Sequence, residues 1–167
     1  LSDRLIAAFL VQDASVAPFH LALDNLAEAL ELGGRVLLHT RLTGFIIENH
    51  RIRGARLRHD RTGEEVVVEA ELVVNAAGAW AREVAGLAGI DIDLIYSKGS
   101  LLITDQRITQ RVINRLRPAS DADILVPGGT VSILGTTSIR IDALDRIVPT
   151  VEESDAIIRM ASAMVPS

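Results

Sequence analysis

Three of the smallest side chains stand together at a place where a ligand could rest on the main chain. Ala76, Ala77 and Gly78 follow Asn75 and come shortly before Trp80, which is the one tryptophan present. Side chains of this size let another molecule approach the backbone closely. These residues are therefore our first candidates for a binding site.

The neighbours of this stretch indicate a strand-to-helix turn. Residues 72–74 are apolar, which predicts a buried strand, and residues 80–87 contain alanines at positions that predict a helix. A pyrophosphate suits such a turn, because the start of a helix presents free backbone N–H groups and the positive end of a dipole. A tight turn that binds no ligand is the alternative, and these residues alone do not decide between the two.

Charged candidates are few. Lys98 precedes Gly99, so a cation could approach a ligand closely there, although an exposed lysine at a strand end has the same pattern. Asp91 and Asp93 could form a carboxylate pair, or they could be solvated acids at a loop edge. His39 stands among apolar residues and is better suited to packing than to catalysis. The four histidines lack the spacing of metal ligands, so we predict no metal site.

The familiar catalytic and nucleotide-binding motifs are missing from these 167 residues. We find no G-x-G-x-x-G, P-loop, G-x-S-x-G or H-E-x-x-H pattern, and no cysteine. Residue types and spacing thus predict a turn that suits a ligand, without a complete set of catalytic groups.

The first half of the chain predicts a helix followed by strands. Pro18 suits the first turn of a helix, which the glycine pair at 33–34 would end. A short strand is expected over residues 36–38. Three further strands, expected over residues 43–48, 52–60 and 64–69, would form an antiparallel meander.

The middle strand of this meander is rich in basic residues. Because they alternate with apolar residues, we interpret them as a solvated face, with a phosphate or partner site as the alternative. The basic residues are Arg51, Arg53, Arg56, Arg58 and Arg61, together with His50 and His59.

The second half predicts more strands and a final helix. Strands are expected over residues 92–96, 100–104 and 111–116, and a hairpin is expected over residues 124–134 with its turn at 127–130. Thr150 and Glu153 have the spacing of a capping box, which predicts a helix that continues to about Met164.

Composition excludes several classes of protein. Hydrophobic residues make up 49% of the chain and aromatic residues 3%, so the core must consist of aliphatic side chains. A net charge of −5 argues against a nucleic-acid partner, and the lack of cysteine excludes disulfides. No apolar run is long enough to span a membrane. The chain does not begin with Met and ends just past the last predicted helix, so we expect it to be a piece of a longer protein.

Four segments together resemble the FAD-dependent glycerol-3-phosphate dehydrogenases of the D-amino-acid-oxidase group. Within that family the chain is most similar to the branch formed by the A subunits of the anaerobic enzymes. The asparagine-alanine-alanine-glycine pattern is common in the whole group, whereas the later three segments are more specific. The segments are residues 72–80 (LVVNAAGAW), 98–103 (KGSLLI), 121–127 (DADILVP) and 134–138 (LGTTS).

The resemblance implies an α+β fold that lacks both ends of the family's chain. Residues 1–90 would be part of a Rossmann-like FAD domain with a β-meander, and residues 91–167 the antiparallel sheet of the substrate or cap domain. Family members begin with a G-x-G-x-x-G segment and continue into a segment with an arginine for the substrate phosphate. Neither is present here.

The resemblance also assigns residues to two binding surfaces, while the catalytic base stays unassigned. Ala76, Ala77, Gly78 and Trp80 match the turn against the diphosphate and adenosine side of FAD. Leu42 matches a strand position whose backbone meets adenine. The substrate side is assigned Lys98, Gly99, Gly135, Thr136 and Thr137.

The implied reaction of the complete enzyme is oxidation of glycerol 3-phosphate to dihydroxyacetone phosphate, with hydride passing from C2 to the flavin. Electrons would then pass through partner subunits to a membrane quinone, which places the enzyme in the cytoplasm at the inner face of the membrane. One alternative is another FAD-dependent oxidase of amino or hydroxy acids. Another is a non-catalytic interaction domain, which an upstream G-x-G-x-x-G followed by a ribose-binding acid would exclude.

The isolated 167 residues are expected to retain no FAD and to turn over no substrate, because half of the flavin contacts would be absent. Exposed apolar surface should also drive them into a dimer or a higher assembly. Absorbance spectroscopy and measurement of the mass in solution at several concentrations check both expectations. A stoichiometric flavin spectrum would contradict the first, and a monomer at every concentration the second.

Overall fold

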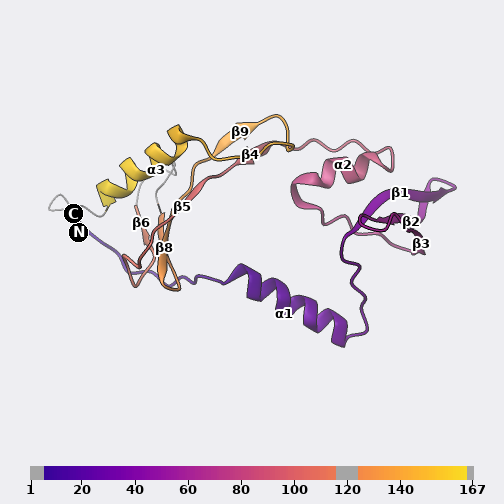
Figure 1. The fold of residues 1–167 in the computed structure, drawn as a ribbon, viewed down its shortest axis with the longest axis horizontal. Helices are drawn as coiled ribbons and strands as arrows, with labels where there is room; N and C mark the ends of the chain where they lie inside the picture. Colours follow the sequence, from indigo (N-terminus) through magenta and orange to yellow (C-terminus); the bar gives the residue numbers. More distant parts are fainter. Residues whose placement is uncertain (1–5, 116–123, 165–167) are drawn as a thin grey trace. The chain divides into compact units, whose positions relative to one another are not determined.

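A computed structural model describes residues 6–115 and 124–164 (Figure 1). The chain forms two compact units: Ala17–Leu94 is one, and Leu1–Val16 with Ile95–Ser167 is the other. We call them the meander unit and the α3 unit, after the elements described below. Both mix helices with antiparallel strands, which confirms the predicted α+β class. Residues 116 and 121–123, on which two of the sequence-based predictions partly fall, lie outside the described residues.

The meander unit begins with helix α1 (Pro18–Glu31), where Pro18 occupies the first turn as predicted. The helix ends at the glycine pair: the N–H of Gly34 donates to the carbonyl of Ala29 at 2.8 Å, and Gly33 has φ +87°. Glycine adopts this left-handed conformation without strain, which is why it ends helices so often. No residue of α1 is buried within the described residues.

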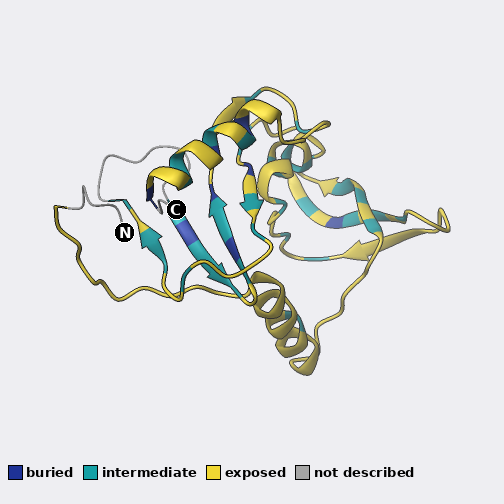
Figure 2. Ribbon diagram, turned by 60° about the vertical axis from the view of Figure 1, so that its left-hand side comes forward, coloured by how far each residue is buried: buried dark blue, intermediate teal, exposed yellow. Residues whose placement is uncertain are grey.

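Strands β1 (Thr40–Glu48), β2 (Arg51–His59) and β3 (Glu65–Glu69) form the predicted antiparallel meander in the order β1-β2-β3. The turn between β1 and β2 consists of Asn49 and His50, which both have positive φ. Two successive residues of this kind give a tight hairpin whose twist matches that of the strands. The arginines of β2 are exposed (Figure 2), which confirms the predicted solvated face.

Two predicted strands and the environment of one histidine are wrong. Residues 36–38 and 72–74 have irregular backbone, and Leu72 and Val74 are 79% and 78% exposed. A strand needs a neighbour that pairs with its N–H and C=O groups, and neither segment pairs with another strand among the described residues. His39 lies in a turn at φ +53°, not in an apolar strand.

Beyond residue 74, a single 3₁₀ turn η1 (Gly78–Trp80) leads into helix α2 (Ala81–Gly86). The predicted helix over residues 80–87 is therefore confirmed to within a residue. The small residues at 76–78 lie just before and within this helical turn, as the sequence indicated.

The α3 unit contains two antiparallel sheets and helix α3 (Val151–Met164), which packs against β5 and β8 (Figure 1). One sheet pairs β4 (Tyr96–Lys98) with β9 (Ile139–Ile141). The other has the order β5-β8-β7-β6 and consists of β5 (Leu101–Ile103), β6 (Ile113–Asn114), β7 (Ile124–Gly128) and β8 (Val131–Gly135).

The strands of this unit differ in detail from the prediction. The strand expected over residues 92–96 begins only at Tyr96, and Lys98 lies inside it rather than in the following loop. The β7–β8 hairpin is longer than expected, because Pro127 and Gly128 still pair with Ser132 and Val131. Its turn contains only residues 129 and 130.

The buried residues of the α3 unit are as often polar as apolar. Leu125 of β7 and Ile157 of α3 are fully buried, and Met164 is 6% exposed (Figure 2). Four polar side chains are buried as well: Ser100, Ser132, Thr137 and Glu153. Buried polar groups are stable only when they are hydrogen-bonded, so the partners of these four show what holds the unit together.

Gly54 of β2 should tolerate no larger side chain, in contrast with Gly44 of β1. A Cβ at Gly54 would collide with the carbonyl oxygen of Val68 and lie 3.2 Å from the Cα of Glu69, both on β3. A Cβ at Gly44 would meet only a side-chain carbon of Arg56, at 3.9 Å. We expect Gly54→Ala to lower the free energy of unfolding by about 1–3 kcal/mol and Gly44→Ala to change it little. Denaturant unfolding of the two variants checks this, and equal effects would contradict it.

Candidate functional site

The carboxylate of Glu153, in the first turn of α3, is the centre of a buried polar cluster. Glu153 is 3% exposed. Its Oε2 accepts a hydrogen bond from the N–H of Thr150 at 2.7 Å, and its own N–H donates to Thr150 Oγ1 at 3.3 Å. This reciprocal pair is the predicted capping box, which is confirmed.

Lys98 of β4 approaches the same carboxylate from the sheet. Its Nζ lies 2.8 Å from Glu153 Oε2 and 2.8 Å from the carbonyl oxygen of Val148, and its side chain is 11% exposed. The ammonium group, which the sequence suggested for a ligand, is therefore part of an ion pair within the α3 unit.

Two hydroxyl groups complete the cluster. Ser100 Oγ and Thr137 Oγ1 donate to Glu153 Oε1 at 3.0 and 3.1 Å, and Thr137 Oγ1 accepts from the N–H of Ser100 at 2.9 Å. The hydrogen bond from Lys98 is the main cause that lowers the pKa of Glu153 to about 2. Burial acts in the opposite direction, and the N–H of Thr150 and the two hydroxyls add to the lowering.

The substrate-side residues predicted from separate motifs come together around this cluster. A Cβ at Gly99 would lie 2.6 Å from Thr136 Oγ1 and 3.0 Å from the carbonyl oxygen of Thr137, so glycine is required for this close approach. A Cβ at Gly135 would collide with the side chain of Leu101. Thr136 Oγ1 donates to the carbonyl of Ser100 at 3.2 Å. Within residues 135–137, Gly135 and Thr137 are buried and Thr136 is exposed.

The turn at residues 75–80 has a bare outer face. Asn75 shapes it from inside, since its Nδ2 donates to the carbonyl of Ala81 at 2.9 Å and its Oδ1 accepts from the N–H of Ala77 at 3.2 Å. Ala76 is exposed, and Gly78, at φ +56°, has no atom within 4 Å of the place a Cβ would occupy. Trp80 is half exposed. These residues fit a cofactor that lies on the main chain, although α2 has only six residues and so contributes little dipole.

Leu42, the predicted adenine contact, lies in β1 opposite Leu57 of β2. The register shifts directly after it, and Thr43 Oγ1 donates to the carbonyl of Arg56 at 3.1 Å there. A break in the ladder leaves main-chain groups of this segment without strand partners, which is what a backbone contact to a base requires.

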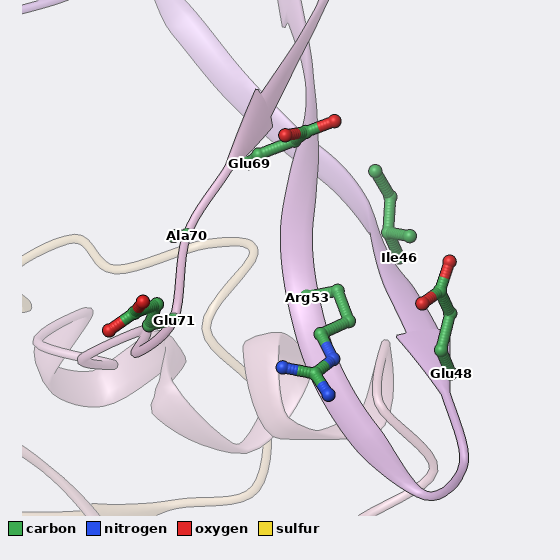
Figure 3. Close-up of a pocket in the computed structure, with 6 residues that line it drawn as sticks. All are labelled: Ile46, Glu48, Arg53, Glu69, Ala70 and Glu71. Carbon is green, nitrogen blue, oxygen red and sulfur yellow. The ribbon is translucent and has the colours of Figure 1, made fainter.

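An open hollow of about 440 Å³ lies elsewhere in the meander unit (Figure 3). Its charged lining is three carboxylates and one guanidinium, a net negative balance that does not suit a phosphate. None of the residues predicted to bind FAD lines it. The lining residues are Ile46, Glu48, Arg53, Glu69, Ala70 and Glu71.

The remaining charged candidates form exposed pairs. Asp91 pairs with Arg82 at 3.0 Å, so the expected carboxylate pair with Asp93 is not formed. The bond from Arg41, at 3.1 Å, is the main cause that lowers the pKa of Asp60. Among the described residues no group of acids and histidines could hold a metal ion.

Sequence reasoning missed the role of Glu153 and did not select Ser100. The only local signal for Glu153 was its spacing from Thr150, which indicates a helix cap. Nothing in the spacing indicated Lys98, which is 55 residues away.

In the part of the chain that the structure describes, no helix has the length and apolar character needed to cross a bilayer.

Comparison with known proteins assigns the class. The model of the FAD dependent oxidoreductase family matches residues 1–167, and the chain belongs to this family. This confirms the family resemblance inferred from the four sequence segments.

Particular relatives narrow the likeness to glycerol-3-phosphate dehydrogenases. The chain is 46% identical over 168 residues to the A subunit of anaerobic glycerol-3-phosphate dehydrogenase from Escherichia coli K12, covering 99% of this chain and 31% of the relative. It is 35% identical over 175 residues to the A1 subunit of the anaerobic enzyme from Haloferax volcanii, covering 99% of this chain and 30% of the relative.

A solved structure supports the same likeness. The glycerol-3-phosphate dehydrogenase from Bacillus halodurans, complexed with FAD, matches 88% of this chain and 31% of its own, with a TM-score of 0.77 and 26% identity. The chain thus spans about a third of the length of the relatives it matches.

Glu153 should make stability depend on pH in an acidic window. Because folding lowers the pKa of this carboxyl from 4.5 to about 2, its ionised form stabilises the folded state fully above about pH 4.5. That stabilisation is lost as the pH falls toward 2. We expect Glu153→Gln to destabilise the protein most near neutral pH, with the difference from wild type shrinking between pH 4.5 and 2.

Unfolding by denaturant at a series of pH values measures this difference. The exposed neighbour Asp155, replaced by Asn, is the matched control and should change stability little throughout. A difference between wild type and Glu153→Gln that is independent of pH would contradict the account.

Proposed function

We propose that these residues are the central part of an FAD-dependent glycerol-3-phosphate dehydrogenase, of the type formed by the A subunits of the anaerobic enzymes. The observation that carries the proposal is the 46% identity to the Escherichia coli protein over nearly the whole chain. The exposed turn at residues 76–78 is the structural feature that supports it, since a chain of an FAD-dependent family needs room for the cofactor. The reaction is oxidation of glycerol 3-phosphate to dihydroxyacetone phosphate.

The meander unit supplies contacts to FAD in this proposal. Ala76, Ala77 and Gly78 hold the diphosphate side through main-chain groups, because no large side chain stands in the way. Trp80 covers the adenosine side, and the backbone at Leu42 meets adenine. Once bound, FAD supplies the acceptor for the hydride that leaves C2 of the substrate.

The α3 unit supplies the substrate side. Gly99 and Gly135 keep two chain segments close together, and Thr136 is the exposed residue of the strand end that follows β8. Lys98 and Thr137 belong to the same edge, with their polar groups turned to Glu153. These residues orient the substrate above the flavin, while other parts of the enzyme hold its phosphate.

The two units correspond to the two domains in this proposal. The domains were expected at residues 1–90 and 91–167, and the units divide between Leu94 and Ile95. The stretch Leu1–Val16 groups with the second unit rather than the first. We assign FAD binding to the meander unit and substrate binding to the α3 unit.

Partners follow from the relatives' names. The Escherichia coli relative is one subunit of its enzyme, so we propose that the complete protein works with electron-transfer subunits and delivers electrons to a membrane quinone. It would then act in the cytoplasm, attached to the inner face of the membrane, and would bind no nucleic acid. Self-association of the isolated residues remains a prediction.

An assay of the complete protein tests the function. We expect purified protein to contain FAD and to reduce a dye in the presence of glycerol 3-phosphate, and not in the presence of amino acids or simple hydroxy acids. Ala76→Leu should place a large side chain on the bare turn and lower FAD content several-fold, whereas Ala79→Leu should retain it.

Flavin absorbance per protein and the rate of dye reduction measure these outcomes. Reduction that depends on an amino acid instead would overturn the choice of substrate. Equal FAD content in both variants would overturn the assignment of the turn.

A further inference from the structure

We propose that Glu153 is a positioning residue for the substrate-side strand end, and that Lys98 is its counter-charge rather than a ligand of the substrate. The inference rests on the proposed function, which assigns residues 135–137 to the substrate side. It adds a residue of α3 that sequence motifs did not associate with that side.

The first step is the way the strand end is held. Gly135 is the last residue of β8 in the ladder, where it pairs with Leu101 and Ile124. Residues 136–138 follow without a strand assignment before β9 begins. Their position therefore depends on single hydrogen bonds: the N–H of Thr137 donates to the carbonyl of Ser100 at 3.3 Å, and Thr136 Oγ1 donates to the same carbonyl.

The second step is that one carboxylate oxygen fixes both sides of this junction. Glu153 Oε1 accepts from Thr137 Oγ1 and from Ser100 Oγ, and the Thr137 hydroxyl accepts in turn from the Ser100 N–H. A hydroxyl that both donates and accepts has its orientation fully determined. Thr136, the exposed neighbour, is thus held in place by a group anchored to the end of α3.

The third step concerns the ammonium group of Lys98. Two of its three donors are used by Glu153 Oε2 and the carbonyl of Val148. Reaching a substrate phosphate would leave the carboxylate of Glu153 buried without its cation, which is strongly unfavourable. Lys98 therefore serves the site by keeping Glu153 ionised, and the phosphate needs another cation.

Thr137→Val removes the hydroxyl while it keeps the side-chain shape. In the complete enzyme we expect the KM for glycerol 3-phosphate to rise about tenfold, because a small displacement near the reacting groups has large kinetic effects. Thr137→Ser keeps the hydroxyl and should restore the KM. Amide hydrogen exchange at residues 136–138 should be faster in the valine variant than in the serine variant.

Thr104→Val is the matched control. The Thr104 hydroxyl also links two strands, since it accepts from the N–H of Ser132 at 2.9 Å and donates to the carbonyl of Gln106. It lies at the opposite end of β5, after Ile103. We expect this variant to lose stability without a change in KM, which separates positioning from general destabilisation.

Lys98→Met and the double variant Lys98→Met/Glu153→Gln test the second half of the proposal. If Lys98 is a counter-charge, the double variant should have a KM within about threefold of wild type, closer to it than either single variant. If Lys98 binds the substrate phosphate, the double variant will be as impaired as Lys98→Met. That result, or an unchanged KM in Thr137→Val, overturns the inference. A wild-type enzyme that does not oxidise glycerol 3-phosphate overturns the proposed function instead.

Discussion

The α3 unit depends on the ionised carboxylate of Glu153. Its four hydrogen bonds come from Lys98, Thr150, Ser100 and Thr137, which belong to a strand, a helix cap and two chain segments that follow or precede strands. A buried charge is tolerated only when every lone pair is used and a counter-charge is near. Because apolar burial in this unit is limited, the carboxylate determines how α3 and the strand ends meet.

This constraint separates the two proposed binding surfaces by their physical character. On the substrate side, geometry is held by a dense set of hydrogen bonds and by glycines that permit close contact. On the FAD side, the decisive feature is bare main chain at residues 76–78, shaped from within by Asn75. One surface is rigid before it meets a ligand, and the other offers room, which matches a bound cofactor and a substrate that must be placed accurately.

How much the sequence could predict depended on how local each signal was. The helix after Pro18, the β-meander and the capping box of Thr150 and Glu153 were predicted because their signals lie within a few residues. Residues 36–38 and 72–74 were predicted as strands from local apolarity, but strands need partners and the described residues provide none. The pairing of Lys98 with Glu153 joins positions 55 residues apart, which no local pattern reveals.

A double-mutant cycle between Lys98 and Glu153 tests the central claim most directly. The free energy of unfolding is measured by denaturant at neutral pH for the complete protein, for Lys98→Met, for Glu153→Gln and for the double variant. If the ion pair holds the unit together, each single variant leaves one buried charge unpaired, and the double variant is more stable than the sum of the single effects predicts. Single effects that simply add would show that the two groups do not depend on each other, and would contradict the account.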